Sequence, residues 1–88
     1  MRYHVEFTKS AYKSLSKLDK YTAKMLMNWI SDKLDNSEDP RLYGKALSAN
    51  PSGLWQYRVG DYRIITKIED DKLIILIVSI GHRREIYD

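Results

Sequence analysis

The sequence predicts an α+β fold in which a pair of helices packs on one sheet. Its first half holds a segment with the alternation of a strand, then two segments whose apolar residues recur with helical spacing. Its second half holds three runs of β-type residues separated by short turn signals. We therefore expect an N-terminal strand, a helical hairpin and a three-stranded antiparallel meander, within one domain that spans residues 1–88.

The N-terminal segment has the pattern of a strand that leads directly into a helix. Residues 2–7, RYHVEF, alternate between apolar and polar side chains, which predicts a half-buried strand. The hydroxyl of Thr8 can cap a helix that begins after it. In that helix Ala11, Leu15 and Leu18 form an apolar stripe. This stripe is expected to face the sheet.

A second helix is expected over residues 20–35, with Asp19 as its cap. Its apolar residues follow the i, i+3, i+4, i+7 spacing: Ala23, Leu26, Met27, Ile30 and Leu34. The link between the two helices is so short that they should form a hairpin. Pro40 favours an end to the helix before it, and residues 41–53 carry the turn signals of a loop.

Three strands are expected in the C-terminal half. Residues 54–59, LWQYRV, and 62–69, YRIITKIE, flank a Gly-Asp turn and predict a hairpin. After a second turn, residues 72–80, KLIILIVSI, are apolar on both faces. That pattern is typical of a strand in the interior of a sheet.

The composition excludes several classes of protein. The chain has no cysteine, so it holds neither a disulfide nor a thiolate metal site, and the cytoplasm is the expected compartment. Its two histidines stand near opposite ends of the sequence, and no Walker A loop, dinucleotide fingerprint or nucleophile elbow occurs. No apolar run is long enough to span a membrane or to serve as a signal peptide. We expect no metal, no cofactor and no membrane contact.

Polar side chains that suit RNA chemistry stand on, or just after, the C-terminal strands. They are Gln56, Arg58, Arg63, His82, Arg83, Arg84 and Tyr87. Neighbouring strands can bring such positions together into one basic site. Arginine matches phosphate oxygens, histidine titrates near neutral pH, and tyrosine can stack on a base. The alternative is that the arginines are solvated or paired with carboxylates such as Asp61 or Glu69, and that Tyr87 only packs the tail.

The net charge of +3 permits contact with nucleic acid without requiring it. Lysines recur along the polar side of the predicted helices, at Lys9, Lys13, Lys17, Lys20 and Lys24. They are most simply the solvated face of the hairpin. Lys9, Lys13 and Lys17 could also contact RNA phosphates.

The C-terminal pattern LWQYRVGDYRIITKIEDDKLIILIVSIGHRREIYD resembles the RelE/ParE toxin superfamily, and within it the RelE branch. The opening FTKSA and the helical hairpin fit the same family, so the resemblance covers essentially the whole chain. It implies the toxin of a bacterial type II toxin-antitoxin pair. Such a toxin is a metal-independent endoribonuclease that enters the ribosomal A site and cuts the messenger.

The resemblance also implies roles for individual residues. Arg63 matches the strand arginine that contacts the scissile phosphate, Arg83 the arginine after the last strand, and Tyr87 the tyrosine that stacks on the messenger base. Well-studied members carry lysines at the places of Gln56 and Arg58. Arginine stays protonated and is a poor base.

His82 is therefore our candidate for proton transfer, with Arg58 as the other possibility. The expected reaction is attack by the messenger's own 2'-hydroxyl on the adjacent phosphorus, giving a 2',3'-cyclic phosphate and a free 5'-hydroxyl.

The same resemblance implies a cognate antitoxin that covers the basic site, and contact with operator DNA only through the toxin-antitoxin complex. Two alternatives remain open at this stage. One is a ParE-like protein that inhibits DNA gyrase by binding. The other is a catalytically weakened member of the same fold, because Gln56 and Arg58 replace lysines.

Overall fold

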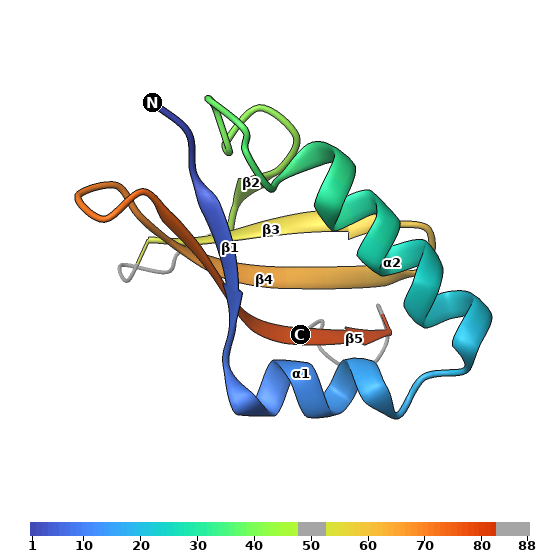
Figure 1. Ribbon diagram of the computed structural model, residues 1–88. Coiled ribbons are helices and arrows are strands. Elements are labelled where there is room, and N and C mark those ends of the chain that lie inside the picture. The colour runs from blue at the N-terminus through green and yellow to red at the C-terminus, as the bar shows by residue number, and fades with distance from the viewer. Residues whose placement is uncertain (48–52, 83–88) are drawn as a thin grey trace.

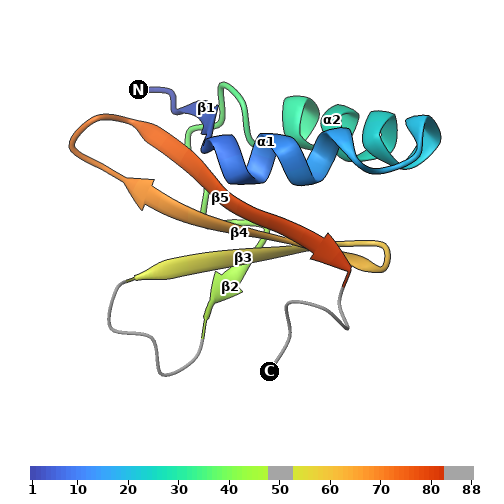
Figure 2. The same ribbon diagram turned by 90° about the horizontal axis from the view of Figure 1, so that it is seen from below.

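Both helices lie over the same face of a five-stranded sheet (Figure 1). The computed structural model describes residues 1–47 and 53–82. Along the chain the elements are β1 (His4–Phe7), α1 (Lys9–Ser16), α2 (Lys20–Lys33), β2 (Lys45–Ala46), β3 (Leu54–Val59), β4 (Tyr62–Glu69) and β5 (Ile74–His82). In the part of the chain that the structure describes, no helix covers the opposite face of the sheet (Figure 2).

The strand order is β1-β5-β4-β3-β2. Strands β3, β4 and β5 form the predicted antiparallel meander, and β5 lies inside the sheet as its apolar sequence predicts. Strand β1 pairs with β5 in parallel, and β2 adds an edge strand antiparallel to β3 inside the segment predicted as a loop. The predicted α+β fold is confirmed, but the sheet is mixed. A strand of two residues is too short to show any alternation, which is why the sequence does not predict β2.

Both predicted helix caps are present. The hydroxyl oxygen of Thr8 accepts a hydrogen bond from the backbone N–H of Ala11 at 3.0 Å. A carboxylate oxygen of Asp19 accepts from the backbone N–H of Thr22, also at 3.0 Å. After the short turn, α2 runs back across the sheet and diverges from α1 (Figure 1). No helix of the described residues is long and apolar enough to cross a bilayer.

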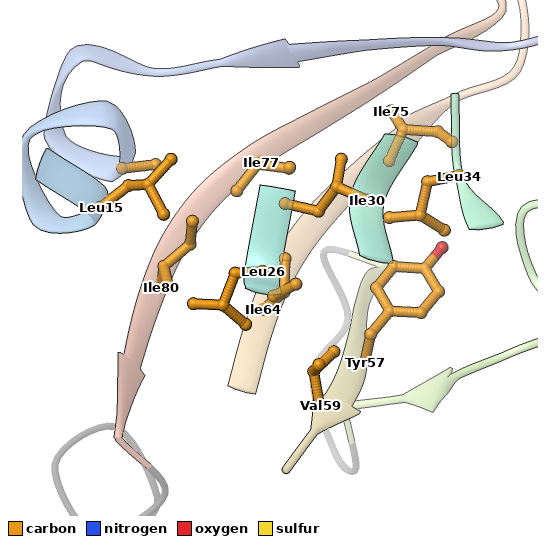
Figure 3. Packing of buried hydrophobic residues seen from close by; sticks show 11 residues of the cluster. Leu15, Leu26, Ile30, Leu34, Tyr57, Val59, Ile64, Ile75, Ile77 and Ile80 are labelled. Carbon is orange, nitrogen blue, oxygen red and sulfur yellow. The ribbon is translucent and has the colours of Figure 1, made fainter. Parts of the chain in front are cut away.

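The core fills the layer between the helices and the sheet (Figure 3). From the sheet, Tyr57, Ile64 and Ile77 contribute side chains with no measurable exposure. The buried residues of α2 are Leu26 and Ile30, and Leu34, which follows the helix as its C-cap, is buried with them. Met27 belongs to the predicted apolar stripe, yet it is 39% exposed. The buried stripe of α2 is therefore narrower than the sequence predicts.

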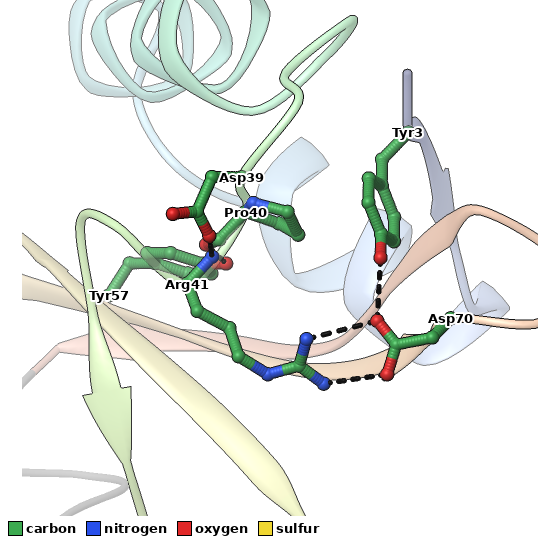
Figure 4. A network of polar contacts seen from close by, with 6 residues as sticks. All are labelled: Tyr3, Asp39, Pro40, Arg41, Tyr57 and Asp70. Atoms are coloured by element: carbon green, nitrogen blue, oxygen red, sulfur yellow. Dashed lines mark hydrogen bonds and ion pairs between the residues drawn. The ribbon is translucent and has the colours of Figure 1, made fainter. Parts of the chain in front are cut away.

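A polar network joins three segments that are distant in sequence (Figure 4). The Arg41 guanidinium donates to both carboxylate oxygens of Asp70, at 2.9 and 3.0 Å, and the Tyr3 hydroxyl donates to one of them at 2.6 Å. These donors lower the pKa of Asp70 to about 2. The network ties the N-terminal segment and the loop after α2 to the turn between β4 and β5.

Asp70→Asn is expected to lower the free energy of unfolding by about 1 kcal/mol or less near neutral pH. The pair is bidentate but half-exposed, so solvent screening limits its contribution. Because the folded-state pKa lies below the ordinary value of 3.8, the contribution is full above about pH 4 and is lost as the pH falls toward about 2. Urea unfolding across this range should show the variant and the wild type converge in acid.

The neighbouring substitution Asp71→Asn is the matched control. Asp71 is exposed in the same turn and makes no ion pair with the described residues. Equal losses from the two substitutions, or a difference that persists near pH 2, would contradict the role of the Arg41–Asp70 pair.

Candidate nucleic-acid interface

Three of the predicted site residues meet on the face of the sheet that the helices leave uncovered, called the open face below. Arg58 on β3 is paired directly opposite Arg63 on β4, and Gln56 is paired opposite Ile65. Paired residues share a face of the sheet, and successive residues alternate between faces. Because Tyr57 and Ile64 point into the core, Gln56, Arg58 and Arg63 point away from it.

The two arginines differ in depth. Arg63 is only 6% exposed, and its Nη1 donates a hydrogen bond to Oε1 of Gln56, which is 8% exposed. Gln56 therefore holds the Arg63 guanidinium in a fixed position. Arg58 is exposed and makes no ion pair with any described residue. Within the described residues, neither Asp61 nor Glu69 forms an ion pair with Arg58, so the alternative of a neutralised Arg58 is not supported there.

Like charges that face each other across strands destabilise a sheet. The direct opposition of Arg58 and Arg63 concentrates positive charge on the open face, and a bound anion would reduce the repulsion between the two guanidinium groups. A phosphate fits best, because its oxygens match the fork of guanidinium donors. The open face is thus suited to a phosphodiester.

A hollow of about 330 Å³ lies beside this pair and is lined by Tyr43, Gly44, Lys45, Gln56 and Arg58. Lys45 opens β2 and is paired opposite Gln56, so it also lies on the open face. Lys45 is absent from the predicted site because the sequence does not predict β2. The only available signal was the Tyr-Gly-Lys sequence itself.

Gly44 allows the segment with Lys45 to lie close to β3. A Cβ atom at this position would meet the backbone oxygen of Gln56 and would lie 2.6 Å from Nε1 of Trp55. Both contacts are shorter than real Cβ contacts, so any larger residue would push β2 away from β3. The placement of Lys45 beside Gln56 depends on this glycine.

His82 does not join the open face. It is paired opposite Tyr62, whereas Gly81 is paired opposite Arg63. Its ring packs edge-on against Tyr62, with the ring centroids 5.5 Å apart, on the side of the sheet that faces the helices. A bulge in β5 causes this, because Ser79 pairs with Ile65 and Ile77 with Thr66, so that Val78 is an extra residue. The expectation that His82 shares a site with Arg63 is corrected accordingly.

The remaining predicted site residues fall into two groups. Lys9 and Lys13 lie on α1 and Lys17 directly follows it, all exposed and across the sheet from Arg58. The structure therefore does not bring them together with the arginines. Arg83, Arg84 and Tyr87 lie outside the described residues.

A family model described as the ParE toxin of the type II toxin-antitoxin system parDE matches residues 5–87. The chain belongs to this toxin family. This family is part of the RelE/ParE superfamily, which the sequence resembles over essentially the whole chain.

Similar proteins carry RelE-type names. The toxin is 31% identical to Toxin RelG of Mycobacterium tuberculosis over 87 residues, which are 99% of this chain and 98% of the relative. Its fold matches the RelBE2 toxin-antitoxin complex of M. tuberculosis with a TM-score of 0.83 and 27% identity, over 97% of this chain and 95% of that one. It also matches the archaeal RelE-RelB complex of Pyrococcus horikoshii, with a TM-score of 0.74 and 26% identity over 97% and 99% of the two chains.

Proposed function

We propose that this toxin is an endoribonuclease that cuts messenger RNA in the ribosomal A site and so stops translation. The observation that carries the proposal is the opposition of Arg58 and Arg63 on the open face, with Gln56 fixing one guanidinium and Lys45 adding a further cation. A site with this much positive charge in one place is suited to the growing negative charge of a phosphoryl transition state.

In the proposed reaction the messenger supplies its own nucleophile. The 2'-oxygen forms a bond to the adjacent phosphorus, the bond from phosphorus to the 5'-oxygen breaks, and the products are a 2',3'-cyclic phosphate and a 5'-hydroxyl. Arg63 and Arg58 would bind the non-bridging phosphate oxygens. From the family resemblance, Arg83 would add a third guanidinium and Tyr87 would stack on a base of the messenger.

We further propose that a cognate antitoxin neutralises the toxin. The similar structure from M. tuberculosis is a toxin-antitoxin complex, RelBE2, and the one from P. horikoshii is a RelE-RelB complex. An antitoxin segment that places carboxylates on the open face would satisfy the exposed Arg58 and Lys45 and would exclude RNA.

Inhibition of DNA gyrase by binding is the second candidate, because the matching family model describes the ParE toxin. Binding alone gives no reason to hold Arg63 in a fixed position beside two exposed cations. A positioned guanidinium is the arrangement that phosphoryl transfer uses.

Primer extension on a messenger in a purified translation system tests the proposal. The wild-type toxin should produce cuts within codons only when ribosomes are present. A parallel supercoiling assay with purified gyrase should show no inhibition. Intact messenger together with inhibited gyrase would overturn the nuclease proposal in favour of the second candidate.

A further inference from the structure

We propose that Lys45 is a catalytic residue that donates the proton to the leaving 5'-oxygen during messenger cleavage. This inference rests on the proposed nuclease function and adds to it a residue outside the family pattern described above. It arises from the hollow beside the arginine pair, which Lys45 lines.

The backbone pairing of Lys45 places this residue on the open face beside the proposed phosphate site. Lys45 is paired opposite Gln56, whose side-chain oxygen accepts from Arg63. The three residues therefore lie on a diagonal across β2, β3 and β4 on the open face. Adjacent strands lie about 4.8 Å apart, and Arg63 stands two residues along β4 from the partner of Gln56, so the backbones of Lys45 and Arg63 are about 12 Å apart. Two long side chains and one phosphate can bridge that span.

Among the described residues on the open face beside the arginine pair, Lys45 is the one whose chemistry suits proton transfer. Arginine is a poor proton donor, and the amide of Gln56 is no acid. A lysine carries its proton at neutral pH and can release it to a strong base such as a departing alkoxide. Well-studied family members carry lysines on β3, at the places of Gln56 and Arg58. This chain instead carries a lysine on the neighbouring strand β2.

Tyr43, which also lines the hollow, and His82 are two other side chains that could donate a proton, and both contact aromatic rings on the helix side of the sheet. The ring of Tyr43 packs against Trp29 of α2, with centroids 6.4 Å apart, and Nζ of Lys33 lies 5.4 Å from the centre of the same ring. Those contacts hold the Tyr43 ring toward the helix layer. His82 lies against Tyr62 on that same side of the sheet.

The 2'-oxygen bonds to phosphorus and passes its proton to water, the bond from phosphorus to the 5'-oxygen breaks, and the Lys45 ammonium gives a proton to that oxygen. The amine then regains a proton from water. No oxidant, metal or second substrate is required.

The test compares two ribosome-bound messengers, one unmodified and one with sulfur in place of the bridging 5'-oxygen at the cut site. A thiolate leaves without needing a proton. Lys45→Ala should cut the unmodified messenger about 10²- to 10⁴-fold more slowly than the wild type but should cut the sulfur messenger at close to the wild-type rate. Lys45→Arg keeps the charge and should remain slow on the unmodified messenger.

Arg63→Ala is the contrasting variant, since a phosphate contact matters for both messengers and sulfur should not rescue it. A wild-type rate for Lys45→Ala, full activity of Lys45→Arg, or equal slowing of Lys45→Ala on both messengers would overturn the role of Lys45. Failure of the wild type to cut either messenger would instead overturn the proposed function, and this inference with it.

Discussion

Replacing Arg63 by alanine is expected to slow single-turnover cleavage of a ribosome-bound messenger by about 10²- to 10³-fold. Arg63 is the buried member of the arginine pair, and the side-chain oxygen of Gln56 fixes its guanidinium before substrate arrives. A donor that is already in place stabilises the transition state without a reorganisation cost. The loss should therefore fall on the rate of the chemical step.

Two variants make the result interpretable. Lys67→Ala removes another cation from the open face of β4, but Lys67 is paired with Leu54 and Leu76 instead of with an arginine. Its rate should change little. Arg63→Ala also leaves the buried oxygen of Gln56 without this donor and should lose some stability, so the exposed Arg58→Ala serves as a second probe. Wild-type rates in folded Arg63→Ala and Arg58→Ala would contradict the phosphate site.

Leu26→Ala is expected to lower the free energy of unfolding by about 3 kcal/mol. The Leu26 side chain has no exposed surface and packs in the layer between α2 and the sheet (Figure 3). A domain of this size has a total stability of roughly 4 to 13 kcal/mol, so the loss is a large share of it. Urea unfolding measured as a shift in midpoint at constant slope is the appropriate assay.

Met27→Ala is the matched control in the same turn of α2. Because Met27 is 39% exposed, its truncation should cost about 1 kcal/mol or less. A larger loss from Met27→Ala than from Leu26→Ala would mean that α2 presents a different face to the sheet.

The parts of the fold that depend on neighbouring residues could be predicted from the sequence. Thr8 and Asp19 cap the helices because a side-chain oxygen meets a backbone N–H three residues later. The two-residue Gly60-Asp61 turn fixes the register of its hairpin, which is why Arg58 and Arg63 meet as expected. Local rules decide these contacts.

Contacts that depend on distant pairing could not be predicted. No local sequence pattern indicates the parallel pairing of β1 with β5 or the short strand β2. For that reason Lys45 could not be predicted as a residue of the candidate site. One extra residue at Val78 reverses the alternation along β5 and turns His82 toward the helices. A single bulge is enough to move a side chain from one face of a sheet to the other.

The most direct test of the nuclease proposal is cleavage of one defined messenger in the ribosomal A site, with and without a single 2'-O-methyl group at the cut position. The proposed reaction predicts an upstream fragment that ends in a 2',3'-cyclic phosphate from the unmodified messenger, and no cut at the methylated position. An unmodified messenger that stays intact, or a methylated one that is cut at the same place, would contradict it.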